Sequence, residues 1–379
     1  MEAILALEDG RVFQGHALGA FGEVSGEVVF NTGLTGYQEI LTDPSYRGQI
    51  VVLTVAHVGN TGINLEDPES GGIQLRGLAV RDAPETSSSW RARGDLGQHL
   101  RVNGIVGIAG LDTRALTRHL RTGGVLRGCI SSVARSAEVA VEQARRTPQL
   151  ETQDLVGEVT CPRSYAFREG RSGLLGPARE TTGRRRRIVA IDYGAKRNIL
   201  RLLVDAGFDV TVAPARTSAA DILALRPEGV FLSNGPGDPA SYGALIQTVG
   251  ALIGKTPVCG ICLGHQMAAL ALGARTFKLK FGHRGTNHPV REERTGQVAI
   301  TSQNHGYAVA EDSLPESLVV THRSLYDGTV EGLAHREASL FTVQFHPEGA
   351  PGPHDSWELF DRFRAMIASG APLARLAHG

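Results

Sequence analysis

The sequence is poor in cysteine, with only Cys129, Cys161, Cys259 and Cys262 among 379 residues. That number is too small for a disulfide scaffold in a chain of this length, so we expect reduced thiols and a cytoplasmic protein. No apolar run approaches the roughly 18 residues that cross a bilayer. The first residues also lack a basic segment before an apolar core. We therefore expect neither a membrane span nor a secretory signal.

An excess of charge is missing too, because 39 Lys and Arg residues are balanced by 39 Asp and Glu residues. No global charge would draw the chain to nucleic acid or to an anionic membrane. The basic run Arg184–Arg187 has no interleaved aromatic residues. A solvated linker edge is therefore a better interpretation of this run than a nucleic-acid patch.

The length predicts two or three domains of roughly 100–200 residues each, and the pattern divides the chain in two. Residues 1–150 carry short strand-like runs and one capped helical pattern, which predict a smaller layered β/α domain. Residues 151–186 have the weak pattern of a linker. From 187 to about 375, strands and helices alternate regularly, which predicts a doubly wound, mainly parallel sheet. Such sheets bind ligands at the carboxyl ends of their strands.

The segment PVCGICLGHQ places Cys262 at a predicted strand-to-helix turn, between Gly260 and Gly264. Small flanking residues allow a nucleophile to occupy a sharp, exposed elbow. The positive end of the following helix stabilises a thiolate. The amide of Leu263 is placed to donate to an oxyanion. We interpret Cys262 as a candidate nucleophile, the alternative being a small buried apolar residue.

Cys259 and Cys262 also match the C-x-x-C pattern of redox and metal sites. Cys259 lies inside an apolar strand pattern, however, and not in the first turn of a helix. A zinc site would need two more closely spaced ligands, which Cys129 and Cys161 do not offer. We therefore expect Cys259 to pack in the core and expect no metal site.

A cysteine nucleophile needs a base, and the base needs an acceptor that orients it. The run LFTVQFHPEG ends a predicted strand directly in His346, Pro347 and Glu348. Pro347 fixes the backbone between them, so that Glu348 can accept the imidazole N–H and set its tautomer. The tripeptide alone is typical of a surface turn, but beside the cysteine elbow it supplies the best available base.

Three other segments have ambiguous patterns. SNGPGDPASYG, with Gly235 and Gly237, follows a predicted strand; it is either a plain turn or a loop that offers N–H groups to a ligand, and Asp238 argues against a dinucleotide site. TSQNHGYAV, with Asn304, is either a turn or a set of substrate contacts, and its spacing favours the turn. GKT at 254–256 fails the P-loop pattern, so we expect no ATP chemistry on this chain.

Together these motifs resemble the class I glutamine amidotransferases over residues 187 to about 372. Cys262, His346 and Glu348 stand where that family has its catalytic triad. Five further segments are similar to the small subunits of carbamoyl-phosphate synthases, over nearly the whole chain: FNTGLTGYQEILTDPSYRGQIV, GIAGLDTRALTRHLR, DYGAKRNILR, KFGHRGTNHPV and PEGAPGPHD.

The resemblance implies eight residues that bind glutamine, in addition to the triad. They are Ser45, Gly235, Gly237, Leu263, Gln266, Asn304, Gly306 and Tyr307. Lys196 is implied as a supporting residue near the site. Tyr307 departs from the usual phenylalanine, and Phe345 replaces an expected glycine; neither change touches the reacting atoms.

The resemblance further implies that the chain hydrolyses L-glutamine through a cysteine thioester. Ammonia would pass to a separate large subunit that makes carbamoyl phosphate from bicarbonate and ATP, for arginine and pyrimidine biosynthesis. ATP and a divalent metal are expected on the large subunit, and no cofactor on this chain. A higher-order assembly of heterodimers is expected. The alternatives are an amidotransferase subunit of another synthase, a stand-alone γ-glutamyl cysteine hydrolase, or a non-catalytic C-x-x-C module.

Overall fold

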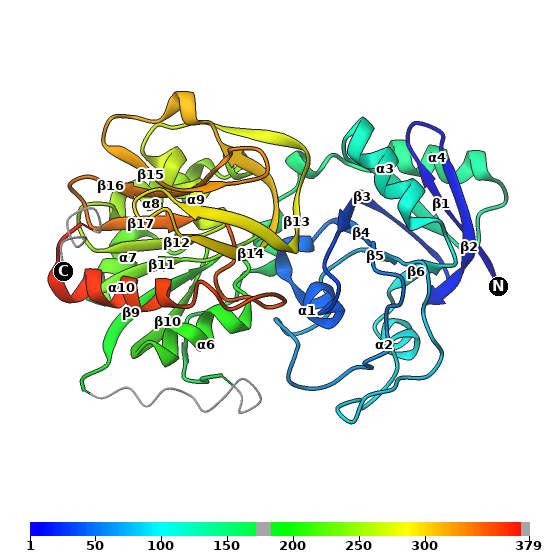
Figure 1. Cartoon of the computed structure of the whole chain (residues 1–379), viewed down its shortest axis with the longest axis horizontal. Coiled ribbons are helices and arrows are strands. Elements are labelled where there is room, and N and C mark those ends of the chain that lie inside the picture. The colour runs from blue at the N-terminus through cyan, green and yellow to red at the C-terminus, as the bar shows by residue number, and fades with distance from the viewer. Residues whose placement is uncertain (172–182, 373–379) are drawn as a thin grey trace. The chain divides into compact units, whose positions relative to one another are not determined.

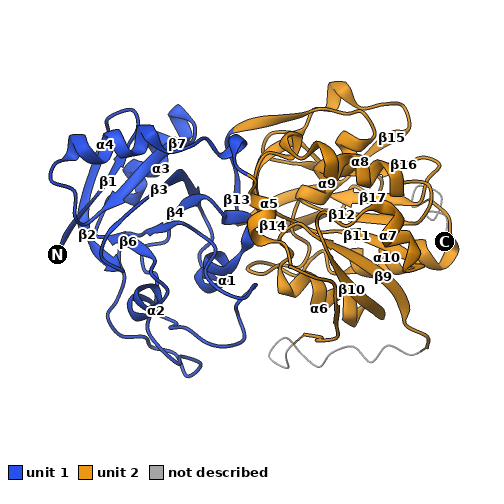
Figure 2. Cartoon of the chain, turned by 180° about the vertical axis from the view of Figure 1, so that it is seen from behind, with its two compact units in different colours: residues 1–153, 280–285 blue, residues 154–279, 286–379 orange. Residues whose placement is uncertain are grey.

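The computed structural model of the chain describes residues 1–171 and 183–372. It divides into two compact units (Figure 2). Unit 1 comprises residues 1–153 and 280–285, and unit 2 comprises residues 154–279 and 286–379. The return of 280–285 to unit 1 is held by backbone hydrogen bonds, among them Val125 N–H to Lys280 C=O at 3.0 Å and Thr32 N–H to Arg284 C=O at 3.1 Å. No local sequence pattern predicts that residues 280–285 belong to unit 1.

Unit 1 is built on a closed barrel of strand order β1-β2-β6-β5-β4-β3-β7. Its strands are β1 (Glu2–Leu7), β2 (Val12–Gly19), β3 (Glu23–Asn31), β4 (Gln49–Leu53), β5 (Gly77–Ala79), β6 (Val106–Ala109) and β7 (Leu126–Ser131). Its helices are α1 (Tyr37–Thr42), α2 (Leu96–Val102), α3 (Thr113–Gly123) and α4 (Ala137–Arg146). A barrel has no open edge strands, so the layered arrangement expected for residues 1–150 closes on itself.

Strand β4 of unit 1 is apolar on both faces. On β4, Ile50 and Val52 belong to one buried cluster, while Val51 and Leu53 belong to another. Helix α3 adds Leu116 to the first cluster. As predicted, its first turn is capped by Asp112, whose carboxylate accepts the Ala115 N–H at 2.9 Å. Burial on both faces explains why the pattern of β4 is continuous and not alternating.

Unit 2 contains a ten-stranded sheet of order β14-β13-β15-β16-β17-β12-β11-β9-β10-β8 (Figure 1). Its strands are β8 (Tyr165–Phe167), β9 (Arg186–Asp192), β10 (Phe208–Pro214), β11 (Gly229–Leu232), β12 (Val258–Ile261), β13 (Thr276–Glu292), β14 (Val298–Val309), β15 (Leu318–Ser324), β16 (Val330–His335) and β17 (Leu340–Val343). The central run β10-β9-β11-β12-β17 is entirely parallel. The predicted doubly wound, mainly parallel sheet is thereby confirmed.

Helices cover both faces of this sheet. They are α6 (Arg197–Asp205), α7 (Ala219–Ala224), α8 (Gly243–Leu252), α9 (Leu263–Ala271) and α10 (Glu358–Ser369). On one face α6 and α10 share a buried cluster that includes Leu203 and Phe363. On the other, α7, α8 and α9 share a cluster that includes Val249 and Met267. The carboxyl ends of the parallel strands are therefore the part of the sheet left for chemistry.

The segment predicted as a linker, residues 151–186, is not one throughout. It holds α5 (Leu155–Val159), and β8, which pairs antiparallel with β10 at the edge of the sheet. The Cys161 N–H also donates to the Asp192 carboxylate at 2.7 Å. An edge strand three residues long has too short a pattern to be recognised in sequence. Residues 172–182 of this segment, and the predicted end of the domain at 375, lie outside the described residues.

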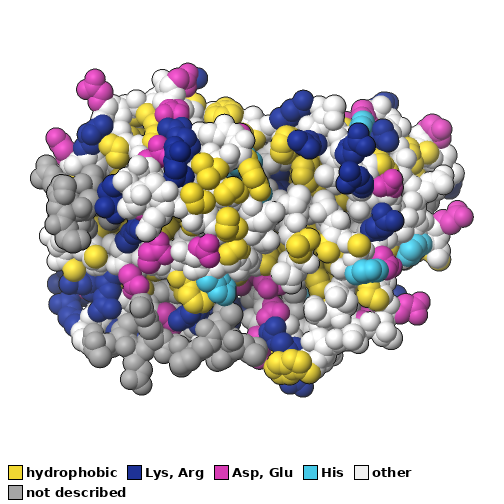
Figure 3. Space-filling model, in the orientation of Figure 1, with side chains coloured by type: hydrophobic (Ala, Val, Ile, Leu, Met, Phe, Trp, Pro, Cys, Tyr) yellow, Lys and Arg dark blue, Asp and Glu magenta, His cyan; other side chains and the backbone are white. Residues whose placement is uncertain are grey.

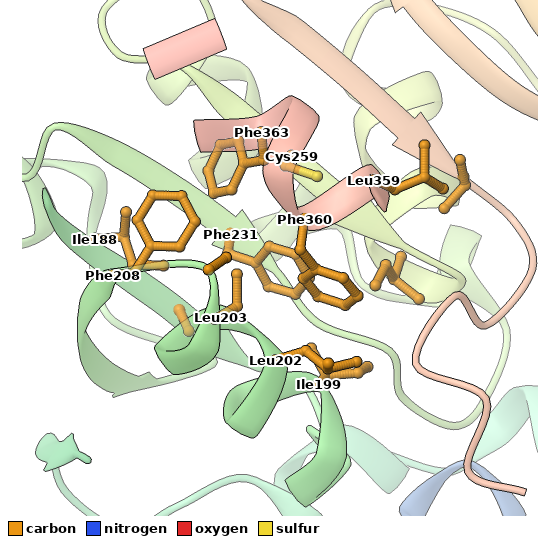
Figure 4. Close-up of a cluster of buried hydrophobic side chains, with 14 of the residues drawn as sticks. Ile188, Ile199, Leu202, Leu203, Phe208, Phe231, Cys259, Leu359, Phe360 and Phe363 are labelled. Atoms are coloured by element: carbon orange, nitrogen blue, oxygen red, sulfur yellow. The ribbon is translucent and has the colours of Figure 1, made fainter. Parts of the chain in front are cut away.

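Cys259 packs in the core, as predicted. Its side chain lies among Phe231, Phe360 and Phe363 between the sheet and α10 (Figure 4). Burial in this apolar cluster raises the pKa of its thiol, which keeps it protonated and unreactive. The redox or metal interpretation of C-x-x-C has no support in this environment.

Among the described residues, no helix combines the length and the apolar character that crossing a membrane requires. On the face seen in Figure 3, basic and acidic side chains both occur over each unit. This surface agrees with the balanced charge of the sequence.

Two histidines are buried in unit 2 without a charge. The Nδ1 of His265 on α9 lies 2.8 Å from the Thr342 hydroxyl of β17. Burial, with the nearby His322, lowers the pKa of His265 to about 3. His322 on β15 lies edge-on to Phe345 with ring centroids 5.5 Å apart. Burial lowers the pKa of His322 to about 4.

The free energy of unfolding of unit 2 should therefore decrease as the pH is lowered from about 6.5 to 4. In that window the unfolded chain protonates both histidines, near their ordinary pKa of about 6.5, whereas the folded chain protonates neither. Acid thus favours unfolding by about 1.4 kcal/mol per pH unit for each histidine. Urea midpoints measured across this range should show the slope, and His322→Gln should reduce it. An unchanged slope in His322→Gln would contradict the assignment.

Candidate active site

Cys262 forms a sharp elbow between β12 and α9. Its backbone has φ 53° and ψ −106°, a conformation that costs a residue with a side chain about 1–3 kcal/mol. Both flanking glycines are required by close packing. A Cβ at Gly264 would lie 2.3 Å from the Leu232 carbonyl oxygen, and one at Gly260 would lie 2.9 Å from the backbone of Gly264. Because β12 pairs with β11 and β17, this elbow places the sulfur at the carboxyl edge of the central strands.

His346 and Glu348 follow β17 at the same edge of the sheet. The His346 N–H donates to the Ser302 carbonyl of β14 at 2.9 Å, which fixes its backbone. Its Nδ1 lies 2.7 Å from Glu348 Oε1. Its Nε2 makes no hydrogen bond to any described residue, and the thiol of Cys262 is near enough to raise the pKa of the imidazole. Nε2 is therefore the nitrogen left to exchange a proton with the thiol.

Glu348 is held by more than the histidine. Lys196, at the start of α6, places Nζ 2.8 Å from Glu348 Oε1, with side-chain exposures of 2% and 0%. The backbone carbonyl of Glu348 accepts hydrogen bonds from Asn198 Nδ2 at 3.0 Å and Trp357 Nε1 at 3.2 Å. Lys196 pairs with the buried carboxylate, which water cannot solvate, and Asn198 and Trp357 fix the backbone that carries it.

Burial and charge act in opposite directions on this pair. Burial alone would lower the pKa of His346, but the negative charge of Glu348 and the contact with Cys262 raise it overall. Burial alone would raise the pKa of Glu348, but Lys196 and His346 lower it overall. The pair therefore consists of an ionised carboxylate and an imidazole that readily takes up a proton.

The two residues predicted to donate to an oxyanion are Leu263 and Gly235. Leu263 is the first residue of α9, so its N–H has no acceptor within the helix. The loop after β11 carries Gly235, where a Cβ would lie 2.3 Å from the Tyr193 carbonyl oxygen. Gly237 follows with φ +91°, and a Cβ there would meet the Tyr242 hydroxyl at 2.3 Å. Only glycine allows the chain to pass so closely at these positions.

The segment TSQNHGYAV is a strand, so the prediction of a turn is wrong. It forms part of β14, and the Asn304 carbonyl lies 3.7 Å from the Sγ of Cys262. The Tyr307 carbonyl accepts the Gln266 Nε2 at 2.8 Å, and Gly306 lies between the two carbonyls. The polar side chains of this segment are buried and not exposed as in a turn. Local turn propensity therefore gave the wrong prediction.

Ser45 lies in unit 1, on the short 3-10 helix Pro44–Tyr46, where its N–H donates to the Asp43 carboxylate at 2.9 Å. Its contact with a substrate stays a prediction. In unit 2 the structure brings together the predicted triad, and it places Leu263 and Gln266 on α9 and Asn304, Gly306 and Tyr307 on β14.

Two contacts of the triad were not anticipated from the sequence. Asn198 and Trp357 both hold the backbone of Glu348, from α6 and from the turn before α10. The only sequence signal for Asn198 is its place just after a predicted strand, at the start of a helix. Nothing in the pattern around Trp357 distinguishes it from a core aromatic residue.

The elbow cysteine, the imidazole–carboxylate pair and the parallel sheet define a cysteine-dependent amidotransferase of class I. The family model described as "Glutamine amidotransferase class-I" matches residues 189–366, and "Carbamoyl-phosphate synthase small chain, CPSase domain" matches residues 5–130.

Curated relatives agree over almost the whole chain. The chain is 55% identical to "Carbamoyl phosphate synthase small chain" of Syntrophotalea carbinolica, covering 97% of this chain and 98% of that protein. It is 51% identical to the protein of the same name from Akkermansia muciniphila, with 97% and 98% covered. The chain belongs to the carbamoyl-phosphate synthase small-chain family.

Gly264→Ala should abolish most of the activity, because its Cβ would displace the elbow from the Leu232 carbonyl. A displacement of about 1 Å at a reacting group can lower the rate about a hundredfold. Gly250→Ala on α8 is the matched control, since its Cβ would have no neighbour nearer than 3.7 Å. Glutamine turnover and thermal unfolding of both variants test this, and a Gly264→Ala variant with normal turnover would contradict the elbow geometry.

Proposed function

We propose that this chain is the glutamine-hydrolysing subunit of a glutamine-dependent carbamoyl-phosphate synthase. The observation that carries the proposal is that Cys262 and His346 follow the neighbouring strands β12 and β17 at the carboxyl edge of the sheet, with Glu348 behind the imidazole. Membership in the small-chain family adds the reaction that the ammonia serves.

In the first half of the reaction, Nε2 of His346 already holds the proton of the Cys262 thiol, and the thiolate attacks the side-chain amide carbon of glutamine. The N–H groups of Leu263 and Gly235 stabilise the tetrahedral oxyanion. One such donor typically contributes about 2.7–4 kcal/mol to transition-state binding. His346 then gives its proton to the departing ammonia, and a γ-glutamyl thioester remains on Cys262.

In the second half, His346 takes a proton from a water molecule that attacks the thioester carbon. The same two amides stabilise the second oxyanion, the C–S bond breaks and glutamate leaves. Glu348 holds the imidazole with Nδ1 protonated throughout, so that Nε2 always faces the reacting atoms. Lys196 keeps Glu348 ionised. No step requires a metal or cofactor on this chain.

The remaining predicted residues would bind the rest of glutamine. Gly237, Gln266, Asn304, Gly306 and Tyr307 of unit 2 are assigned to this role, together with Ser45 of unit 1. Peptide groups and side-chain amides of this kind suit the two charged groups that glutamine carries on its α-carbon.

The partner in this proposal is the carbamoyl-phosphate synthase large subunit, which would use the ammonia with bicarbonate and ATP. Ammonia released to neutral water becomes mostly ammonium and loses its nucleophilic lone pair, so direct transfer is favoured. The proposal includes a divalent metal with the ATP on the large subunit, an assembly of such heterodimers in the cytoplasm, and a role in arginine and pyrimidine biosynthesis.

Subunits of other synthases and stand-alone hydrolases share the triad, but unit 1 speaks against both alternatives. The small-chain model matches residues 5–130, which a minimal amidotransferase domain does not need.

Cys262→Ser should abolish glutamine hydrolysis, whereas Cys259→Ser should retain most of it, because Cys259 only packs in the core. In complex with the large subunit, Cys262→Ser should also abolish carbamoyl phosphate synthesis from glutamine and leave synthesis from added ammonia intact. Equal loss of hydrolysis in both variants would contradict the proposed nucleophile. Loss of the ammonia-dependent reaction would contradict the division of labour.

A further inference from the structure

We infer that Gln344 is a positioning residue that fixes the side-chain amide of Gln266 and thereby the recognition of the α-ammonium group of glutamine. This inference rests on the proposed function and adds to it a residue to which neither the sequence motifs nor the catalytic contacts assign a role. Gln344 directly follows β17 and lies two residues before His346.

The orientation of the Gln266 amide follows from a backbone carbonyl. The Tyr307 carbonyl can only accept a hydrogen bond, and it lies 2.8 Å from Gln266 Nε2. The amino group of the Gln266 amide must therefore face Tyr307. The same Nε2 lies 2.9 Å from Gln344, so Gln344 must present its oxygen there. Both hydrogens of the amino group are thus taken.

The two hydrogen bonds leave the oxygen of the Gln266 amide for a ligand. Gln266 lies one turn along α9 from Cys262, whose carbonyl accepts the Gln266 backbone N–H at 3.1 Å. An amide oxygen close to the nucleophile suits the ammonium group of an α-amino acid, since each N–H of the ammonium needs an acceptor. A rotated amide would present its amino group to the ammonium and repel it.

Strand geometry places Gln344 on the side of the sheet that faces α9. Its neighbours Val343 and Phe345 belong to the apolar cluster on the opposite face. Thr342, two residues earlier, contacts His265 of α9. Successive side chains of a strand alternate between the faces, so Gln344 follows Thr342 toward α9. Its backbone N–H donates to the Glu331 carbonyl at 2.8 Å, which fixes its position on the strand.

The second acceptor of the Gln266 amide is held in place as well. His305 Nδ1 lies 2.8 Å from the Tyr307 carbonyl, and His305 Nε2 lies 3.0 Å from Gln303 Oε1. Gln303 in turn donates from Nε2 to the Glu331 carboxylate at 2.9 Å. The two acceptors of the Gln266 amide thus belong to one buried polar network that joins β14, β16 and β17.

The polar side chain of Gln344 adds little to the stability of the fold. It is fully buried, and its Nε2 has no hydrogen-bond partner among the described residues. Leaving a buried donor unpaired is unfavourable, so an apolar side chain of similar shape should be tolerated at this position. A glutamine here is therefore better explained by its effect on Gln266 than by folding.

The test is a double-mutant cycle of Gln344→Met, Gln266→Met and the double variant, each assayed with L-glutamine and with 4-carbamoylbutanoate, which lacks the α-ammonium group. Gln344→Met should unfold at the wild-type temperature and raise the KM for glutamine by about ten- to hundredfold, the range of a charge-assisted hydrogen bond. It should change kcat little and leave kcat/KM for 4-carbamoylbutanoate within about threefold. In the Gln266→Met background it should add no further change.

Three outcomes would overturn the inference: an unchanged KM in Gln344→Met, an equal loss with both substrates, or effects that add fully in the double variant. A Gln344→Met protein that fails to fold would overturn it too, because it would show a structural role. Glutamine turnover by the wild-type protein is the separate check on the proposed function. If the wild-type protein hydrolyses glutamine and the cycle gives one of these results, the inferred role of Gln344 is wrong although the proposed function stands.

Discussion

The buried contact between Lys196, Glu348 and His346 is the interaction on which the rest of the site depends. Two positive groups, an ammonium and an imidazole that can become imidazolium, share one fully buried carboxylate oxygen. A carboxylate removed from water is stable only with such partners. Removing Lys196 would leave the pair with less positive charge, while removing Glu348 would leave His346 without the group that sets its tautomer. The reactivity of Cys262 therefore depends on the balance of charge among Lys196, Glu348 and His346.

The sheet brings these groups together because its central strands are parallel. Cys262 follows β12 and His346 follows the neighbouring β17, so both reach the same edge although 84 positions separate them in the sequence. The glycines at 235, 260 and 264 then let the loop after β11 and the start of α9 approach the elbow closely. The hydrogen-bonded network around Gln266 has a similar function. It fixes the side-chain amide of Gln266 by hydrogen bonds, just as Glu348 fixes the imidazole of His346 by its charge.

Much of this site could be predicted from the sequence, because its patterns are local. The strand-to-helix alternation placed Cys262 at a strand end, and the tripeptide His346–Pro347–Glu348 offered a base with its acceptor. Lys196 and Glu348 lie 152 positions apart, and no local pattern joins them. The strand β14 was mistaken for a turn because its polar side chains are satisfied by distant partners. The edge strand β8 and the return of 280–285 to unit 1 likewise depend on tertiary pairing.

The protonation state of His346 tests the charge balance most directly. Nitrogen-15 NMR of histidine-labelled protein, with His346→Asn used to assign the signal, reports whether each ring nitrogen carries a hydrogen. Because Glu348 and the contact with Cys262 together raise the pKa of His346, we predict that both nitrogens remain protonated well above pH 7 in the free protein. A His346 signal that shows a neutral ring at pH 7, or that titrates below the ordinary value of about 6.5, would contradict this view of the site.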